Sequence, residues 1–278
     1  MTLSELLEGA RRRPGGLRFL SHESEDAPLV GWDELLRRAD VVAGGLTALG
    51  VQPGEPVALV FPTCAGFFEA FFGVLRCGAV PVPLYPPLRL ARLEEYHRRT
   101  AAMLKAAGAV LVLAQPRVRR LLGPGVAPAR PRLGCRTLDG LPEGEAPPSV
   151  MTGANDLALV QFSSGTTREP RPVALTHRAL LAQTERLNGY WPQPPEGAVD
   201  SGLSWLPLYH DMGLIGCVLP ALAVGGELTL LPPERVVARP ALWLRALSAT
   251  RATISPAPSF AYGLCAEKVT DKELEALV

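Results

Sequence analysis

A cluster of hydroxyl side chains near the middle of the chain has the composition of an anion-binding loop. Serine and threonine hydroxyls can donate hydrogen bonds, and a glycine among them lets backbone N–H groups turn toward one anion. Two arginines follow, and their charge would offset that of a phosphate group. The segment directly follows an apolar run of strand length, so we predict a phosphate-binding loop after a strand. Its members are Ser163, Ser164, Gly165, Thr166, Thr167, Arg168 and Arg171.

The sequence of this loop is also compatible with an ordinary turn, and it differs from two common nucleotide-binding motifs. Clusters of Ser, Thr and Gly are also common in ordinary turns without a ligand. The loop lacks the spaced glycines and the Gly-Lys-Ser/Thr ending of a Walker-type phosphate loop. No Gly-x-Gly-x-x-Gly pattern follows a strand-like segment, which argues against a dinucleotide site. The hydroxyl cluster is therefore a different kind of phosphate loop, or a turn.

Composition limits the function classes that need consideration. The chain has 278 residues, 47% hydrophobic and 20% charged, which is enough for about two globular domains. Its net charge of +1 gives no reason to expect nucleic acid as a partner. The apolar region 57–85 is interrupted by charges and prolines, so we expect no transmembrane segment. Residues 1–13 lack the apolar core of a signal peptide, and we expect a cytoplasmic protein with five reduced cysteines.

Helix-like and strand-like segments alternate along the chain. Helical spacing of apolar residues predicts helices at 32–49, 65–76 and 93–107, and apolar runs predict strands at 57–61, 79–84 and 109–114. Residues 123–149 are rich in Pro, Gly and Arg, which predicts an irregular connection. The alternation predicts an α/β fold with a parallel sheet and a boundary near residue 150. The two expected parts are 1–150 and 151–278.

The second part continues the alternation. It includes a strand at 156–162 before the hydroxyl loop, and a helix at 179–187 after it. A proline-rich loop then starts at Trp191. Further strands are expected at 202–206, 227–230 and 252–255, with helices at 212–224 and 241–249.

Three further segments give the hydroxyl loop a family context. They are Ser204-Trp205-Leu206-Pro207-Leu208-Tyr209-His210-Asp211-Met212-Gly213-Leu214, Ser255-Pro256-Ala257-Pro258-Ser259-Phe260-Ala261-Tyr262-Gly263-Leu264-Cys265, and Gly78-Ala79-Val80-Pro81-Val82-Pro83. With them, the chain resembles the adenylate-forming superfamily, and within it the fatty acyl-AMP ligases and long-chain acyl-CoA synthetases. The resemblance covers nearly the whole chain and implies the multilayered α/β sheets of the amino-terminal adenylating domain, incomplete here.

The resemblance implies a two-step activation of a fatty acid. A carboxylate attacks the α-phosphate of ATP with Mg²⁺, giving acyl-adenylate and pyrophosphate, before transfer to an acyl carrier protein or coenzyme A. It implies that Ser163, Ser164, Gly165, Thr166, Thr167 and Arg171 hold the β and γ phosphates, with Thr166 or Thr167 beside the metal. Such a site must spread and neutralise the charge of the transition state.

The histidine motif has a functional and a structural interpretation. By resemblance, His210 positions the substrate and stabilises charge beside the carboxylate and α-phosphate. It need not act as a base, because a fatty acid is already ionised near neutral pH. Asp211 either orients the imidazole or caps the following helix. Met212, Phe260 and Tyr262 either contact the acyl chain or pack in the core.

The sequence departs from the family pattern at the loop and in length. Arg168 and Pro172 stand where the family has glycine, and Arg171 stands where it has lysine. The lost glycines stiffen the loop, so we predict weakened ATP handling. The adenine-binding segment and the catalytic lysine of the family lie beyond Val278. We therefore expect that these residues alone do not complete adenylation.

Two alternatives to a fatty acid-activating ligase are kept open. One is a degenerate homologue that acts as an acyl-binding, nucleotide-binding or scaffold module in lipid or polyketide assembly. The other is a serine hydrolase using Ser163 or Ser164 with His210 and Asp211. It is the weaker one, because adjacent His and Asp residues cannot readily form a catalytic relay and no Gly-x-Ser-x-Gly segment occurs.

Overall fold

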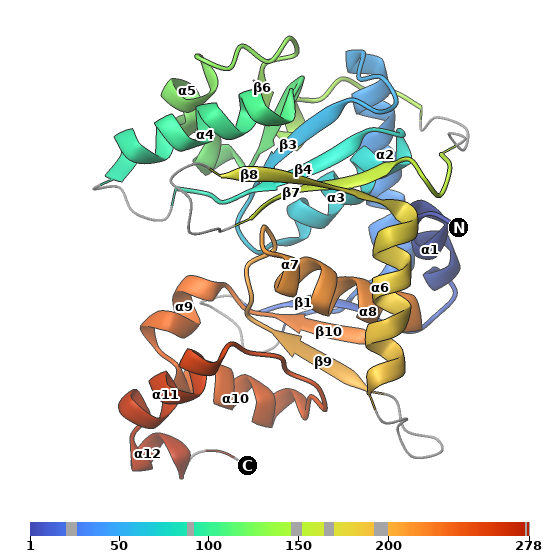
Figure 1. Ribbon diagram of the computed structural model, residues 1–278. Coiled ribbons are helices and arrows are strands. Elements are labelled where there is room, and N and C mark those ends of the chain that lie inside the picture. Colours follow the sequence, from blue (N-terminus) through green and yellow to red (C-terminus); the bar gives the residue numbers. More distant parts are fainter. Residues whose placement is uncertain are drawn as a thin grey trace. The chain divides into compact units, whose positions relative to one another are not determined.

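The computed structural model describes residues 1–20, 27–87, 92–145, 152–163, 170–191, 200–275 and 277. The contacts group the chain into two compact units (Figure 1). Unit 1 comprises Met1–Gly9 and Asp33–Ala182, and unit 2 comprises Ala10–Trp32 and Gln183–Val278. In this grouping the chain passes from unit 1 to unit 2 after Ala182. The expected boundary near residue 150 was based on a change of composition. The division into 1–150 and 151–278 stays a prediction.

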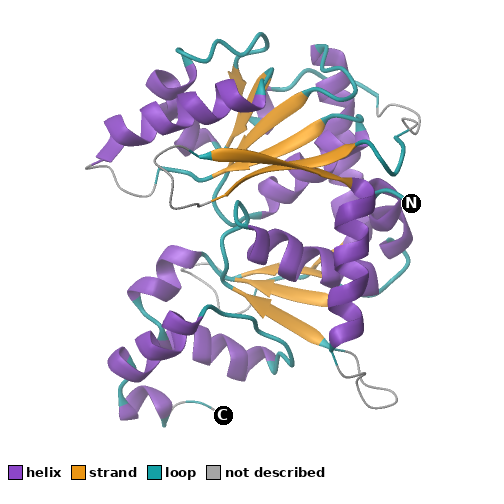
Figure 2. Cartoon of the chain, viewed as in Figure 1, coloured by secondary structure: helices purple, strands orange, loops and turns teal. Residues whose placement is uncertain are grey.

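Unit 1 is built on a parallel sheet, as the alternation of helices and strands predicts. Its order is β4-β3-β5-β6, and every neighbouring pair is parallel. Because crossovers between parallel strands are right-handed, the reversal of direction at β4 directs the helices before and after it to opposite faces. Figure 2 shows these strands in orange with helices around them. The strands are β3 (Pro56–Val60), β4 (Val80–Leu84), β5 (Leu111–Ala114) and β6 (Cys135–Arg136).

Aromatic residues of one helix form much of the core of unit 1. Phe67, Phe68, Phe71 and Phe72 are all buried on α3, and Gly73 lets α2 approach closely, since a Cβ there would lie 2.6 Å from Val42. The predicted helices 32–49, 65–76 and 93–107 are confirmed. The helices are α1 (Leu3–Ala10), α2 (Trp32–Leu49), α3 (Ala65–Arg76), α4 (Leu93–Ala107), α5 (Pro116–Val126) and the 3₁₀ turn η2 (Leu138–Gly140).

The expectation of an irregular connection from residue 123 is wrong at its start, because α5 continues to Val126 with Pro124 inside it. Packing against α4 overrides the low helix propensity of Gly and Pro. A Cβ at Gly125 would lie 3.3 Å from the backbone of His97, and His97 Nε2 lies 2.7 Å from the Leu121 carbonyl oxygen, to which it donates. The helix therefore depends on tertiary contacts that sequence spacing does not show.

The hydroxyl loop connects two antiparallel strands, not a strand and a helix as expected. β7 (Leu157–Ser163) pairs with β8 (Arg171–Thr176), and α6 (His177–Tyr190) begins directly after β8. Pro172 lies within β8 and has no N–H to donate to a sheet ladder. Among the described residues β8 pairs with β7 alone, and a missing N–H is tolerated on an edge strand. β7 also contacts β4, and Val160 joins the core of unit 1.

Unit 2 contains a second sheet with the order β2-β1-β10-β9. β1, β10 and β9 are parallel, and β2 is antiparallel to β1. The pairing of β1 with β10 joins segments about 200 residues apart, and an ion pair between Arg18 and Glu227 accompanies it. The strands are β1 (Gly16–Phe19), β2 (Val30–Gly31), β9 (Ser201–Ser204) and β10 (Glu227–Leu230).

A continuous helical segment with an irregular middle joins β9 to β10. The predicted helix 212–224 is present, but its middle is a π-helical turn before Pro220, whose ring nitrogen has no proton to donate. Gly225, with φ +64°, ends it. The helical elements after β9 are α7 (Asp211–Gly213), the π turn η3 (Leu214–Val218), α8 (Leu219–Val224), α9 (Pro233–Ala238), α10 (Ala241–Thr250), α11 (Ser259–Lys268) and α12 (Asp271–Leu274).

The predicted strand 252–255 is reduced to one bridge between Ile254 and Gly202. The Ile254 carbonyl accepts from Leu203 N–H at 2.9 Å, so the segment does run beside β9. Pro256 and Pro258 then supply no N–H groups, and the ladder stops. Among the described residues, no helix is long and apolar enough to cross a membrane.

One buried histidine ties the amino terminus to unit 1. His177 begins α6, is 2% exposed, and its Nδ1 accepts a hydrogen bond from Leu3 N–H at 3.1 Å. Burial lowers the pKa of His177 below its ordinary value of 6.5, although Asp156 and Glu5 raise it. Protonation of Nδ1 would also remove the acceptor for Leu3. The neutral ring is therefore the form that the fold requires.

This contact predicts a loss of stability in mild acid. Because the pKa is lower in the folded chain, the unfolded chain binds more protons, and the stabilising contribution present above pH 6.5 is lost as the pH falls through the folded value. We expect His177→Asn, which keeps an acceptor but does not titrate, to flatten this dependence. Urea denaturation at several pH values between 5 and 8 measures it. Equal slopes for the two proteins would contradict the prediction.

Candidate functional site

The ends of the hydroxyl loop are fixed by the hairpin of unit 1. Ser163, the last residue of β7, and Arg171, the first of β8, are register partners, and both are exposed. No ion pair of Arg171 occurs within the described part of the chain, so its guanidinium is available to an anion. Both are among the predicted phosphate-binding residues. The remaining members, Ser164, Gly165, Thr166 and Thr167, together with Arg168, lie outside the described residues.

His210 caps the helical segment that follows β9 in unit 2. Its side chain is 48% exposed, and Nδ1 lies 3.3 Å from Met212 N–H and 2.7 Å from Asp211 Oδ1. Both contacts involve Nδ1, so this nitrogen is occupied by the protein's own chain. Nε2 has no partner within the ranges that the structure describes. It is the ring nitrogen that could donate to a bound carboxylate or phosphate.

Asp211 contacts both the imidazole and the first turn of the helical segment, the two groups between which the sequence left its role open. Its Oδ1 contacts the imidazole and also accepts a hydrogen bond from Met212 N–H at 2.7 Å. The residue before it, His210, holds the capping position, and Asp211 lies in the first turn. A carboxylate here also suits the positive end of the helical segment. Asp211 Oδ1 thus satisfies an amide of the first turn and lies against the imidazole of His210.

Three aromatic or sulfur-containing residues that were candidates for acyl contact are not core residues in this chain. Phe260 and Tyr262 on α11 are 58% and 57% exposed, and Met212 is 41% exposed. Phe260 makes an edge-to-face contact with Trp205, and Tyr262 makes one with Trp243, at centroid distances of 6.3 and 5.6 Å. Each aromatic ring therefore packs one part on unit 2 and leaves the rest accessible.

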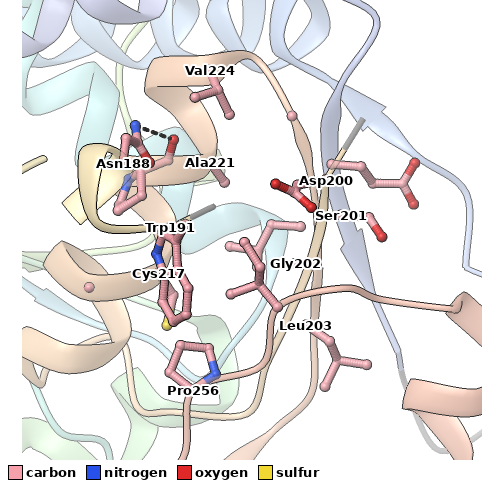
Figure 3. Close-up of a pocket in the computed structure, with 16 residues that line it drawn as sticks. Asn188, Trp191, Asp200, Ser201, Gly202, Leu203, Cys217, Ala221, Val224 and Pro256 are labelled. Atoms are coloured by element: carbon pink, nitrogen blue, oxygen red, sulfur yellow. Dashed lines mark hydrogen bonds between the residues drawn. The ribbon is translucent and has the colours of Figure 1, made fainter. Parts of the chain in front are cut away.

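A pocket of about 250 Å³ lies in unit 2 beside the helical segment (Figure 3). Its walls are β9, the start of β10, one face of η3 and α8, the end of α6 and the segment at Ile254. Asn188 joins two of these walls by donating from Nδ2 to the Pro220 carbonyl oxygen at 3.3 Å. Most lining side chains are apolar. They include Trp191, Leu203, Cys217, Ala221, Val224, Leu228 and Pro256.

Among the described lining residues, the charged ones lie at one end of this pocket. Asp200 precedes β9 and Glu227 begins β10, so both carboxylates lie at the amino ends of these parallel strands. Asp200 accepts a hydrogen bond from Thr253 Oγ1 at 2.8 Å, and Glu227 pairs with Arg18. The chain reaches His210 only after leaving the carboxyl end of β9. The acidic end and His210 are therefore at opposite ends of this strand.

Sequence reasoning did not single out the residues of this pocket. Cys217 was assigned to the core, and it is buried, with its thiol pKa raised to about 11 by burial, so the thiol is neutral near pH 7. A signal was present in the spacing of residues 216, 217, 220, 221 and 224, which share one face of a helix. The partners of that face come from strands and loops far away in the sequence.

The candidate residues form two groups, each described within its own unit. The hairpin of unit 1 brings Ser163 and Arg171 together, and unit 2 brings His210, Asp211 and Met212 together at the start of one helical segment. Phe260 and Tyr262 belong to unit 2 on a separate helix.

Comparison with known proteins identifies the family. Residues 8–277 match the model of the AMP-binding enzyme family. A putative acyl-CoA synthetase of Caulobacter vibrioides is 34% identical over 99% of this chain and 47% of its own length. A long-chain-fatty-acid–AMP ligase, FadD26 of Mycobacterium marinum, is 32% identical over 99% of this chain and 48% of its own length.

Solved structures agree with this assignment. A fatty acyl-adenylate ligase from work on the E. coli and L. pneumophila enzymes superposes with a TM-score of 0.89 at 30% identity, over 99% of this chain and 49% of its own. An L. pneumophila enzyme solved with acyl adenylate and pyrophosphate gives a TM-score of 0.85 at 26% identity, over 99% of this chain and 47% of its own. This chain thus spans about half the length of these relatives. The predicted resemblance is confirmed, and the chain belongs to the AMP-binding enzyme family.

Proposed function

We propose that this chain is the acid-binding and phosphate-binding portion of an ATP-dependent, fatty acid-activating ligase. The ligase forms an acyl-adenylate and pyrophosphate with Mg²⁺, and passes the acyl group to a carrier protein or to coenzyme A. The observation that carries the proposal is the apolar pocket of unit 2 beside the helical segment that His210 caps. Relatives named as fatty acid ligases support it.

Charge favours one orientation of a fatty acid in the pocket. A carboxylate is repelled by Asp200 and Glu227 at the acidic end, whereas an imidazole N–H at the other end of β9 can donate to it. The alkyl chain is then the part that the apolar walls remove from water, which contributes about 0.8 kcal/mol for each buried CH₂ group. The carboxylate end would lie on the His210 side, where activation requires it.

The hairpin of unit 1 supplies the phosphate part of the proposal. Arg171 is a cation at the base of a hydroxyl-rich loop, and Ser163 is its partner across the strand pair. Guanidinium groups recognise phosphates through paired, charge-assisted hydrogen bonds. Together with Thr166 or Thr167 beside Mg²⁺, these residues would hold the β and γ phosphates of ATP.

A second candidate is a homologue that binds acids without activating them. Pro172 favours it, because this residue fixes the backbone next to Arg171 within β8 and removes a donor there. Both candidates use the same pocket, and they differ in whether the hairpin binds polyphosphate.

Calorimetric titration of the 278-residue chain with dodecanoic acid, and separately with Mg²⁺-pyrophosphate, tests the proposal. We expect both ligands to bind and each longer saturated acid from hexanoic to dodecanoic to bind more tightly, because more CH₂ groups are buried. Binding of the acid without pyrophosphate would favour the non-activating module. Failure to bind any saturated acid in this range would overturn the proposed function.

A further inference from the structure

Gly216 is a position where side-chain volume could be added to the unit 2 pocket without moving the backbone. It lies in the π turn η3 and lines the pocket. A Cβ built there would meet Met212 Cγ at 3.7 Å and the Asp211 carbonyl oxygen at 3.9 Å, which are ordinary van der Waals separations. A larger residue would therefore fit at position 216, and close packing does not explain why a glycine stands there.

The other two glycines of the pocket are constrained more tightly. A Cβ at Gly202 in β9 would lie 2.8 Å from Leu228 Cδ1, and one at Gly226 would lie 3.3 Å from Val224 Cγ2. Gly202 is required by the close approach of Leu228, and Gly226 leaves little room beside Val224. Gly216 differs from both, because its neighbours would accept a larger residue.

Gly216 also occupies the end of the lining face that is closer to His210. The face continues through Cys217, Pro220 and Ala221 to Val224 at the acidic end. Gly216 follows His210 by six positions, which corresponds to about 9 Å along an α-helix. Gly216 is therefore the lining residue of this face that lies nearest to His210 in the sequence.

We propose that Gly216 sets the length of acyl chain that the site accepts, by keeping open the passage from the carboxylate position to the pocket. This inference rests on the proposed function. A larger side chain at position 216 blocks the passage, so long acids lose the burial of their distal CH₂ groups. Short acids, whose chains end before Gly216, are unaffected. The residue acts on chain length alone and takes no part in the chemistry.

The test compares acids of different length on one variant. In calorimetric titrations of the 278-residue chain, we expect Gly216→Leu to weaken dodecanoic acid at least about tenfold, the effect of losing two or more buried CH₂ groups. Hexanoic acid should change less than about twofold, and Gly216→Ala should give a smaller, graded effect on dodecanoic acid. Neither substitution is disfavoured by helix propensity, since glycine is the poorer helix former.

A matched control separates pocket filling from a general effect of the substitution. Gly123 on α5 is an exposed helical glycine of unit 1 with no atom within 4 Å of a Cβ placed there. Gly123→Leu should leave both affinities unchanged. If the unsubstituted chain binds dodecanoic acid and Gly216→Leu weakens both acids equally, or neither, this inference fails while the proposed function stands. If the unsubstituted chain binds no acid, the proposed function itself fails.

Discussion

Replacing Arg171 by alanine is expected to weaken Mg²⁺-pyrophosphate binding to the 278-residue chain about 10- to 100-fold. Hydrogen bonds to charged groups contribute about 1.5–3 kcal/mol, and each 1.4 kcal/mol corresponds to tenfold in affinity. Arg171 is exposed at the base of the hydroxyl loop and makes no ion pair within the described part of the chain. Loss of this side chain should therefore lower the affinity for pyrophosphate and leave the free energy of unfolding unchanged.

Two further variants make this result specific. Arg171→Lys, which introduces the residue type that the family resemblance implies at this position, should recover most of the affinity, because the positive charge remains at the same place. Arg178→Ala removes another exposed arginine from the same unit and should have little effect. If Arg171→Ala binds pyrophosphate as tightly as the unsubstituted chain, the assignment of the hairpin to phosphate binding is wrong.

The second large effect concerns stability. Phe71→Ala is expected to lower the free energy of unfolding of unit 1 by about 3–5 kcal/mol, the range for removing a fully buried aromatic side chain. Phe71 is 0% exposed on α3, and its ring stacks on Phe67 at 5.9 Å and meets Phe72 edge-to-face at 5.2 Å. Truncation leaves a cavity that these rings cannot fill, since both are themselves fixed on α3.

Urea denaturation of Phe71→Ala and of a surface variant measures this cost. Val41→Ala is a suitable control, because Val41 on α2 is 74% exposed and its truncation should change stability by less than about 0.5 kcal/mol. A cost below 1 kcal/mol for Phe71→Ala would show that the aromatic cluster does not form the core of unit 1. The midpoint and the slope of the urea transition should both be compared between the variants, because the two units can unfold in separate transitions.

The elements that could be predicted are those with local signals. Trp32–Leu49 and Ala65–Arg76 show helical spacing of apolar residues over several turns, and Gly50, with φ +91°, ends the first of them. The elements that were missed depend on distant partners. β1 is a short segment that becomes a strand only beside β10, and α5 remains helical through Pro124 because α4 packs on it.

In the candidate site, too, the residues with a local sequence signal could be predicted and those that depend on distant segments could not. His210 and Asp211 were found because their motif is contiguous, and the structure places both at the start of one helical segment. The pocket was not found, because its walls come from segments between Asn188 and Pro256 that no single periodicity connects. The strand β8 after the hydroxyl loop was also missed, because Arg171–Thr176 is a short segment that becomes a strand beside β7.

Photo-crosslinking with a dodecanoic acid that carries a diazirine at its methyl end tests the central claim most directly. The claim is that the unit 2 pocket holds the acyl chain with its carboxylate toward His210. After irradiation and peptide mapping, we predict labels on the distal pocket residues, such as Ala221 and Val224, and their loss in Gly216→Leu. Competition by unlabelled dodecanoic acid should abolish them. Labels that compete but map outside the pocket, or that cluster at His210, would contradict the account.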